Sequence, residues 1–270
     1  MRARTLAIVG VGTLVALYFF RSDLRDLMLE WQKSQLPDEI SRDDLKTRSP
    51  SPFPSASPRQ SATPVPFAGI NLAVPFSPQA PFGNWELPYG EACEETSAIL
   101  VDHFYRGTPI SPEIAKQEID ALVAWQQQVF GYYKHTTAAE TAQILKRYFG
   151  YARVDVEYDA TIETIRNHVI AGRPVIVPLA GRLLGNPNYR RPGPPYHMLV
   201  VKGFTKDGDV ITNDVGTSRG HNYVYKPDVF LNAMHDVPSG GDDWPAGVDP
   251  ASYILTGNRA IVVVYPNKSQ

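Results

Sequence analysis

The one cysteine in this chain of 270 residues stands where a loop turns into a helix. Cys93 lies within Gly90-Glu91-Ala92-Cys93-Glu94-Glu95-Thr96-Ser97, and apolar residues follow it at helical spacing. The N–H groups of a first helical turn have no partner inside the helix, and with the helix dipole they favour a thiolate over a thiol. A single cysteine is also often a small buried apolar side chain. Cys93 is therefore a candidate nucleophile whose partners decide its role.

A histidine and an aspartate occupy the two ends of a predicted β-hairpin. His197 begins one strand and Asp214 ends the next, around a turn at Lys206-Asp207-Gly208. A symmetric tight turn places Asp214 opposite Val201, four residues short of His197. A longer turn, or a bulge helped by Gly203, is therefore needed to bring the two side chains together.

Cysteine, histidine and aspartate together form the usual arrangement of an activated thiol nucleophile. Here Asp214 accepts the Nδ1–H of His197, and the imidazolium stabilises the thiolate of Cys93. Gln79, in a Pro-rich loop before the cysteine, can donate its amide to an oxyanion beside the Cys93 backbone N–H. This chemistry requires no metal and no organic cofactor. The reserve candidates for the base are His135 and His221.

The elements that must position these groups change their period along the chain. Spacing and capping residues predict helices from Cys93, over 112–128, from the Thr137 capping box to Gly150, and over 161–171. After an extended entry at 71–76, alternation and apolar runs predict strands over 152–158, 174–179, 197–204, 209–214 and 260–265. Helices first and a mostly antiparallel sheet second make an α+β domain, placed at residues 70–266.

Residues 1–22 predict an uncleaved signal anchor. The uncharged run 5–20 would rise about 24 Å as a helix, slightly less than the roughly 30 Å hydrocarbon core. Its end, Leu17-Tyr18-Phe19-Phe20, lacks the small residues that a signal peptidase needs. The arginines before the run tip the orientation slightly toward a cytoplasmic N-terminus, so we expect a membrane-anchored, extracytoplasmic domain. Residues 23–69 predict a polar helix, over 23–35, and a Pro/Ser-rich disordered tether.

The composition excludes several classes of protein and partner. A net charge of −2 without a basic cluster argues against a nucleic-acid partner. One cysteine rules out an internal disulfide and any zinc site built from several thiolates. The expected partners are a peptide or protein substrate and the membrane, and the sequence leaves the oligomeric state open.

Several stretches resemble the double-glycine leader (bacteriocin-processing) peptidase-like proteins, a branch of the papain-like cysteine peptidases. They are Pro78-Gln79-Ala80, residues 90–97, residues 172–177, residues 197–204 and Asn213-Asp214. The likeness runs from Asn71 to Pro266 and implies a papain-like fold in which the cysteine helix packs on the sheet that carries the histidine. It also implies four roles: Cys93 as nucleophile, His197 as base, Asp214 as its orienter and Gln79 as oxyanion donor.

Three positions depart from the pattern of this family, which often has Gly beside the cysteine and Pro after the aspartate. Ala92, Glu94 and Val215 occupy these places. The carboxylate of Glu94 opposes thiolate formation, unless it complements the helix dipole and points away.

The sequence therefore predicts a membrane-tethered cysteine peptidase-like hydrolase that cleaves an amide bond through a Cys-His-Asp triad. Three alternatives stay open: a catalytically inactive peptide-binding module of the same fold, a thiol amidase or acyltransferase acting on cell-wall peptides, and a purely structural surface protein.

Overall fold

The computed structural model of this protein describes residues 24–47, 67–241 and 244–266. The chain divides into two compact units, Met1–Leu36 and Pro37–Gln270. In the first, residues 24–34 form a helix, as the apolar spacing predicts. The anchor predicted at residues 1–22 lies outside the described residues. Among the helices that are described, none is long and apolar enough to cross a bilayer.

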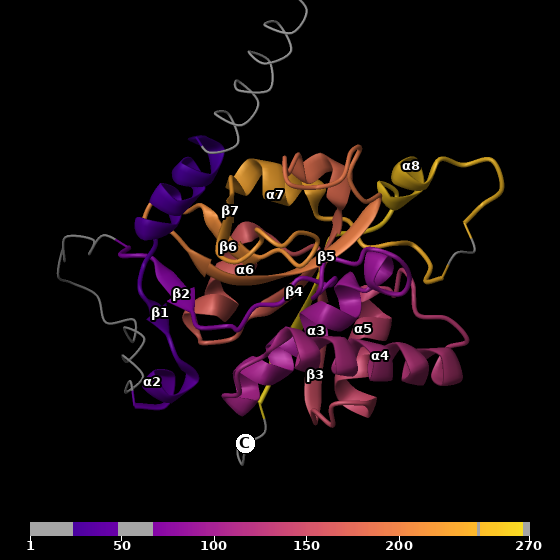
Figure 1. The fold of residues 1–270 in the computed structure, drawn as a ribbon, viewed down its shortest axis with the longest axis horizontal. Helices are drawn as coiled ribbons and strands as arrows, with labels where there is room; N and C mark the ends of the chain where they lie inside the picture. Colours follow the sequence, from indigo (N-terminus) through magenta and orange to yellow (C-terminus); the bar gives the residue numbers. More distant parts are fainter. Residues whose placement is uncertain (1–23, 48–66, 242–243, 267–270) are drawn as a thin grey trace, which may run out of the picture. The chain divides into compact units, whose positions relative to one another are not determined.

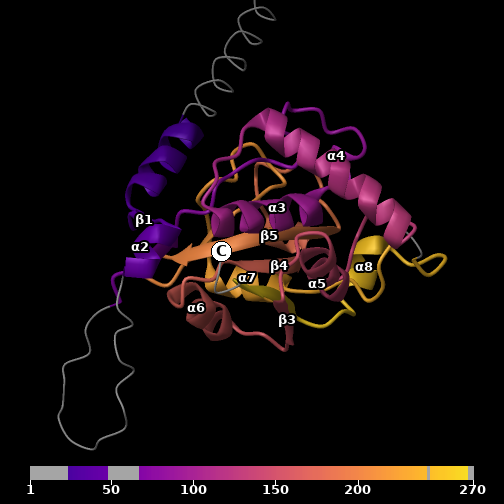
Figure 2. The ribbon, with the colours of Figure 1, turned by 90° about the horizontal axis from the view of Figure 1, so that it is seen from below.

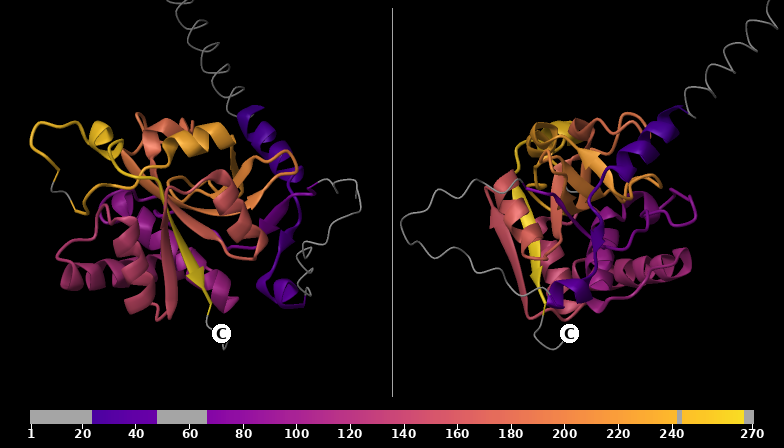
Figure 3. Two further views of the ribbon diagram at one scale, coloured as in Figure 1. Left: turned by 180° about the vertical axis from the view of Figure 1, so that it is seen from behind. Right: turned by 90° about the vertical axis from the view of Figure 1, so that its left-hand side faces the viewer.

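The second unit is built on a sheet of eight described strands (Figure 1). The order is β1-β2-β5-β4-β8-β3, and β6 and β7 extend the sheet from β5. Pairing is antiparallel throughout these strands except between β1 and β2, and Figure 3 shows β8 beside β3. The strands are β1 (Glu39–Ile40), β2 (Ile70–Leu72), β3 (Arg153–Tyr158), β4 (Val175–Ala180), β5 (Tyr196–Phe204), β6 (Val210–Asn213), β7 (Tyr223–Tyr225) and β8 (Ala260–Tyr265).

Several helices begin at capping residues that can be recognised in the sequence. Ser111, Thr137 and Thr161 each accept a backbone N–H of the first turn that follows. Figure 2 shows α3 and α4 on one side of β4 and β5, and α6 on the other. The helices are α2 (Arg42–Thr47), α3 (Cys93–Arg106), α4 (Pro112–Val129), α5 (Ala138–Arg147), α6 (Ile162–Ile170), α7 (Pro227–Ala233) and α8 (Pro250–Ile254), with short 3₁₀ turns η1 (Tyr89–Glu91) and η2 (Gly181–Leu184).

Helix α3 is the central helix of the unit. Every residue from Cys93 to Tyr105 is buried, because the helix lies against β5 and β4 on one side and α4 and α5 on others. Its polar residues are buried with the rest. The start of α3 is therefore held rigidly against the sheet, which is what a nucleophile at that position requires.

The folded unit begins earlier than predicted. Residues 37–47, expected to belong to the tether, form β1 and α2, and β1 pairs with β2. The fully buried ammonium of Lys202 binds Glu39, and Ile40 and Leu45 pack against the core. A short, mostly polar sequence folds here because strand pairing and an ion pair supplement its few apolar contacts. The Pro/Ser-rich residues 48–66 lie outside the described residues.

Candidate active site

Cys93 is the first residue of α3 and is only 6% exposed. The backbone of Met198 faces its sulfur and favours the thiolate, and α3 packs against β5, the strand that carries His197. The first N–H groups of α3 have no acceptor within the helix. Those of Glu94 and Glu95 interact with their own carboxyl groups, and that of Cys93 can stabilise a developing negative charge.

His197 and Asp214 form a buried pair. Nε2 of His197 lies 2.8 Å from Oδ1 of Asp214, and the two side chains are 1% and 0% exposed. The predicted pairing of these residues is confirmed, but the predicted nitrogen, Nδ1, is wrong. Because Nε2 faces the carboxylate, Nδ1 is the ring nitrogen left to exchange a proton with a thiol.

A β-bulge creates this pair. Between Val201 and Gly203 the register of β5 with β6 shifts by one residue, so that Asn213 lies opposite Val200. Asp214, one position further along, therefore falls on the face of β5 that carries His197. Without the extra residue it would fall on the opposite face, since a one-residue slip turns every side chain over. The bulge that the sequence required is present.

The carboxylate of Asp214 accepts five hydrogen bonds. Although burial alone would raise its pKa, the charge of His197 and the hydrogen bonds hold the pKa below its ordinary value. The carboxylate is therefore ionised and fixed in orientation. The donors are His197 Nε2, the Gly216 N–H, Asn186 Nδ2, Tyr189 OH and Tyr225 OH.

Two neighbours fix the imidazole ring itself. The ring of Tyr189 meets that of His197 edge-on, with centroids 5.5 Å apart and planes at 75°. The backbone at Gly216 passes so close that a Cβ there would lie 2.9 Å from Cε1 of His197. Only glycine allows this approach without displacing the ring.

Gln79 lies beside the start of α3, as predicted, with its amide directed at η1. Its Nε2 donates to the backbone oxygens of Tyr89 (2.9 Å) and Gly90 (3.0 Å), and its own N–H donates to Val215 O. Both amide hydrogens thus hold the turn before Cys93. The oxyanion role of Gln79 stays a prediction, and it requires one of these two bonds to be exchanged.

Glu94 points at the sulfur rather than away from it. The thiol of Cys93 donates to Oε2 of Glu94 at 3.0 Å, and Glu94 is 0% exposed. Burial, followed by the charge of Glu94, raises the pKa of Cys93 well above its usual value, while burial raises the pKa of Glu94 to about 8. The idea that Glu94 merely complements the helix dipole is therefore wrong: it is in direct contact with the reacting atom.

The reserve histidines face other carboxylates. His135 Nε2 is 3.8 Å from Glu91, and His221 Nε2 is 3.4 Å from Glu39. A cavity of about 550 Å³ does not include the thiol either, because its lining comes from the last turn of α3, with His103, and from α4 and its surroundings. His197 directly precedes Met198, whose backbone faces the Cys93 sulfur.

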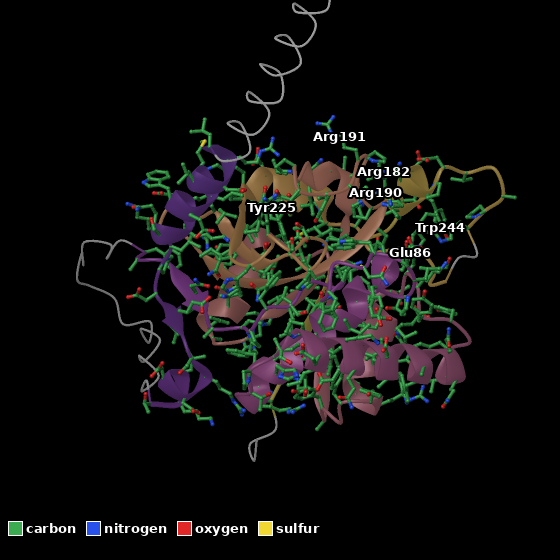
Figure 4. All side chains as sticks on the ribbon, viewed as in Figure 1. Glu86, Arg182, Arg190, Arg191, Tyr225 and Trp244 are labelled. Carbon is green, nitrogen blue, oxygen red and sulfur yellow. The ribbon has the colours of Figure 1, made fainter. Side chains whose placement is uncertain are left out.

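The loop that leads into His197 carries three exposed arginines. Arg182, Arg190 and Arg191 lie between β4 and β5, and Nε of Arg182 donates to Gly193 O at 3.4 Å. Figure 4 shows all three near the start of β5, with Glu86 and Trp244 lower in the same view. The loop before His197 therefore carries positive charge.

Comparison with known proteins places the chain. Residues 71–236 match the model of the Peptidase_C39 like family. The chain belongs to this family. The matched stretch contains Cys93, His197 and Asp214, and membership supports the predicted papain-like α+β architecture and a cysteine peptidase-like function.

Two solved structures are similar to this C39-like peptidase chain. One is a putative C39-like peptidase from Bacillus anthracis, with a TM-score of 0.44 and 16% identity, covering 73% of this chain and 96% of the other. The second is a fragment of prointerpain A from Prevotella intermedia, with a TM-score of 0.36 and 17% identity, covering 57% and 42%. No curated protein matches the chain.

Sequence reasoning missed part of this C39-like site. Asn186 and Tyr225 complete the set of donors around Asp214. Asn186 lies in the loop before β5, and Tyr225 lies in β7, a strand that the sequence did not predict. No spacing connects them to Asp214, because three separate elements bring them together. The only signal was chemical: a buried carboxylate needs several donors.

Proposed function

We propose that this protein is a cysteine peptidase in which Cys93, His197 and Asp214 act as a triad. His197 Nδ1 takes the thiol proton, and the sulfur attacks the carbonyl carbon of a peptide. The C–N bond then breaks as His197 returns the proton to the leaving amine, and water hydrolyses the thioester. The backbone N–H of Cys93 receives the oxyanion, together with Gln79 once its amide leaves Tyr89 or Gly90.

One observation carries this proposal. The hydrogen bond of 2.8 Å between His197 Nε2 and Asp214 fixes the orientation of the base, whose other nitrogen is Nδ1. His197 lies on β5, the strand whose next residue, Met198, faces the Cys93 sulfur. Base and orienter come from one hairpin, and the nucleophile comes from a helix far from it in the sequence. An arrangement of this order is the structural signature of nucleophilic catalysis.

The narrower proposal is a preference for small residues at the scissile bond, as in double-glycine leader peptides. Cys93 is 6% exposed and His197 1%, so little room exists for bulky side chains beside the reacting carbonyl. A glycine pair lets a peptide backbone approach such a sulfur closely. The membrane anchor and an extracytoplasmic location belong to the same proposal, and they rest on the sequence of residues 1–22.

The test is hydrolysis of defined peptides by the full chain. Peptides with Gly-Gly, Ala-Ala or Leu-Leu before the cleavage point, cell-wall peptides and amine acceptors are incubated with the protein, and products are identified by mass spectrometry. Cleavage after Gly-Gly that disappears in Cys93→Ala and His197→Ala supports the peptidase. Products from cell-wall peptides or amine acceptors alone would favour an amidase or acyltransferase.

A second candidate is a peptide-binding module without turnover. It is favoured by the buried thiol, whose pKa is raised well above its usual value by burial and by Glu94. Under this alternative the Gly-Gly peptide binds the wild-type protein and Cys93→Ala equally well, and neither yields a product.

A further inference from the structure

We propose that Glu94 is a further catalytic residue, which works in its neutral form by donating a hydrogen bond to the Cys93 thiolate. This inference rests on the proposed function, because it assigns a role at the same nucleophile. It also turns a departure from the sequence pattern into part of the mechanism.

The geometry places Glu94 on the reacting atom. Its Oε2 lies 3.0 Å from the sulfur of Cys93, within reach of a hydrogen bond in either direction. Among the described residues, its other oxygen, Oε1, has no hydrogen-bond partner although it is fully buried, and the backbone groups of Glu94 and Thr136 that act on the carboxyl group only partly offset the effect of burial. A buried carboxylate with one unpaired oxygen is costly, whereas a neutral carboxyl group is not. The site thus favours the protonated form.

The surroundings of Glu94 point the same way. No described Lys or Arg forms an ion pair with Glu94, and the groups around it are acidic or neutral, so burial raises its pKa to about 8. The titratable groups that face it or its neighbours are Cys93 and Glu95 on α3, Glu91 on η1, Tyr196 on β5 with its partner Asp236, and His135, which is 3.8 Å from Glu91. At neutral pH Glu94 therefore carries its proton.

The protonation state of Glu94 decides which way the hydrogen bond runs. An ionised Glu94 accepts the thiol hydrogen and opposes its loss. A neutral Glu94 donates its O–H to the sulfur once the S–H bond has broken and the proton has moved to Nδ1 of His197. Glu94 keeps its own proton throughout, so no proton is gained or lost beyond the transfer from Cys93 to His197.

The decisive variants separate donation from charge. Glu94→Gln retains a donor at the same position, and Glu94→Met has similar length but no donor. We expect kcat/KM of Glu94→Gln to stay near wild type at neutral pH and that of Glu94→Met to fall about a hundredfold. Wild-type activity should decline above about pH 8, and this decline should vanish in Glu94→Gln. Glu95 is a buried neighbour that does not touch the sulfur, so Glu95→Gln should still show the decline in activity above about pH 8.

Alkylation gives a readout that needs no substrate. Because Cys93 is the only cysteine, iodoacetamide consumption reports on this thiol alone, with Cys93→Ala as the blank. We expect the alkylation rate of the wild type to flatten above about pH 8, that of Glu94→Gln to keep rising, and that of Glu94→Met to be lowest at neutral pH. Thermal unfolding shows whether each variant is folded.

Two results would overturn the role of Glu94. If Glu94→Met reacts as fast as the wild type or faster, the carboxyl group only obstructs the thiol. If Glu94→Gln is as slow as Glu94→Met, the negative charge is what matters. Failure of the peptidase proposal looks different: no peptide is cleaved, while the alkylation profiles of the variants still differ.

Discussion

His197 and Asp214 share one face of their hairpin because β5 gains one residue between Val201 and Gly203. The side chain left over at this bulge is Lys202, which is fully buried and binds Glu39. One irregularity thus orients the candidate base and ties β1 to the sheet. β-Bulges commonly re-aim side chains next to functional sites.

Replacing Asp214 by Asn should remove most activity. An Asn side chain offers one acceptor oxygen in place of two, and its NH₂ group faces donors such as Tyr225 OH at 2.5 Å. We expect a fall in kcat/KM of about 10⁴, as found when the orienter of a triad is changed to Asn, and a loss of stability of about 1–3 kcal/mol. Tyr225→Phe, which removes one donor, is the control: kinetics close to those of Asp214→Asn would show that packing, not charge, is at stake.

An added methyl group at Gly216 should displace the imidazole. Its Cβ would lie 2.9 Å from His197 Cε1 and 3.1 Å from Tyr189 Cε1, closer than van der Waals contact. We expect Gly216→Ala to lower kcat about a hundredfold, since small misplacements at a reacting centre have effects of this size. Steady-state kinetics and thermal unfolding measure both effects. Unaltered kcat would show that the ring moves freely.

Stability should depend on pH through Glu94. Its folded pKa, about 8, lies above the ordinary value of 4.5, so its contribution is fully present below pH 4.5 and is lost as the pH rises through 8. Glu94→Gln, which cannot ionise, should therefore raise Tm relative to wild type at pH 9 more than at pH 6. Each kcal/mol corresponds to about 2–4 °C in a domain of this size. Equal Tm differences at the two pH values would contradict this assignment.

The arginines of the loop before His197 should favour acidic peptides. Arg190 and Arg191 are exposed and follow Tyr189, which bonds to Asp214. Arg190→Glu with Arg191→Glu should lower kcat/KM for a substrate carrying Asp near the scissile bond about tenfold or more, and raise it for one carrying Lys. High salt should shrink both changes. Indifference to the charge of the substrate would separate this loop from the binding site.

A chain that starts at Ile70 should be less stable than one that starts at Pro37. The shorter chain lacks Glu39 and leaves the buried ammonium of Lys202 without its counter-charge. Such a loss costs about 3–5 kcal/mol when both partners are buried, and less here because Glu39 is partly exposed. Urea unfolding measures the difference. In Lys202→Met the difference in stability between the two chains should be smaller. An equally large difference would have to come from strand pairing alone.

The sequence predicted the parts of the fold that local rules control. Ser111 and Thr137 cap their helices as expected, and the strands at 153–158 and 260–265 match their alternation. Of the site, Cys93 was placed at a helix start, and counting residues across the turn called for a longer turn or a bulge near Gly203, of which the bulge is found.

What the sequence could not predict depends on distant contacts. Which imidazole nitrogen faces Asp214 depends on the rotamer of His197, and the direction of Glu94 depends on packing around α3. The fold of residues 37–47 depends on Lys202, more than 150 positions away, so composition alone suggested a tether.

The position of β1 changes how far a membrane-held enzyme could reach. Because the folded unit starts at Pro37, the Pro/Ser-rich residues 48–66 follow the start of this unit in the sequence and do not separate it from an N-terminal anchor. The linker between an anchor at 1–22 and the folded unit is then the helix 24–34, about 17 Å long, and a few flanking residues. An enzyme held by the proposed anchor would act only in a thin layer next to the lipid, and its substrates would have to reach that layer.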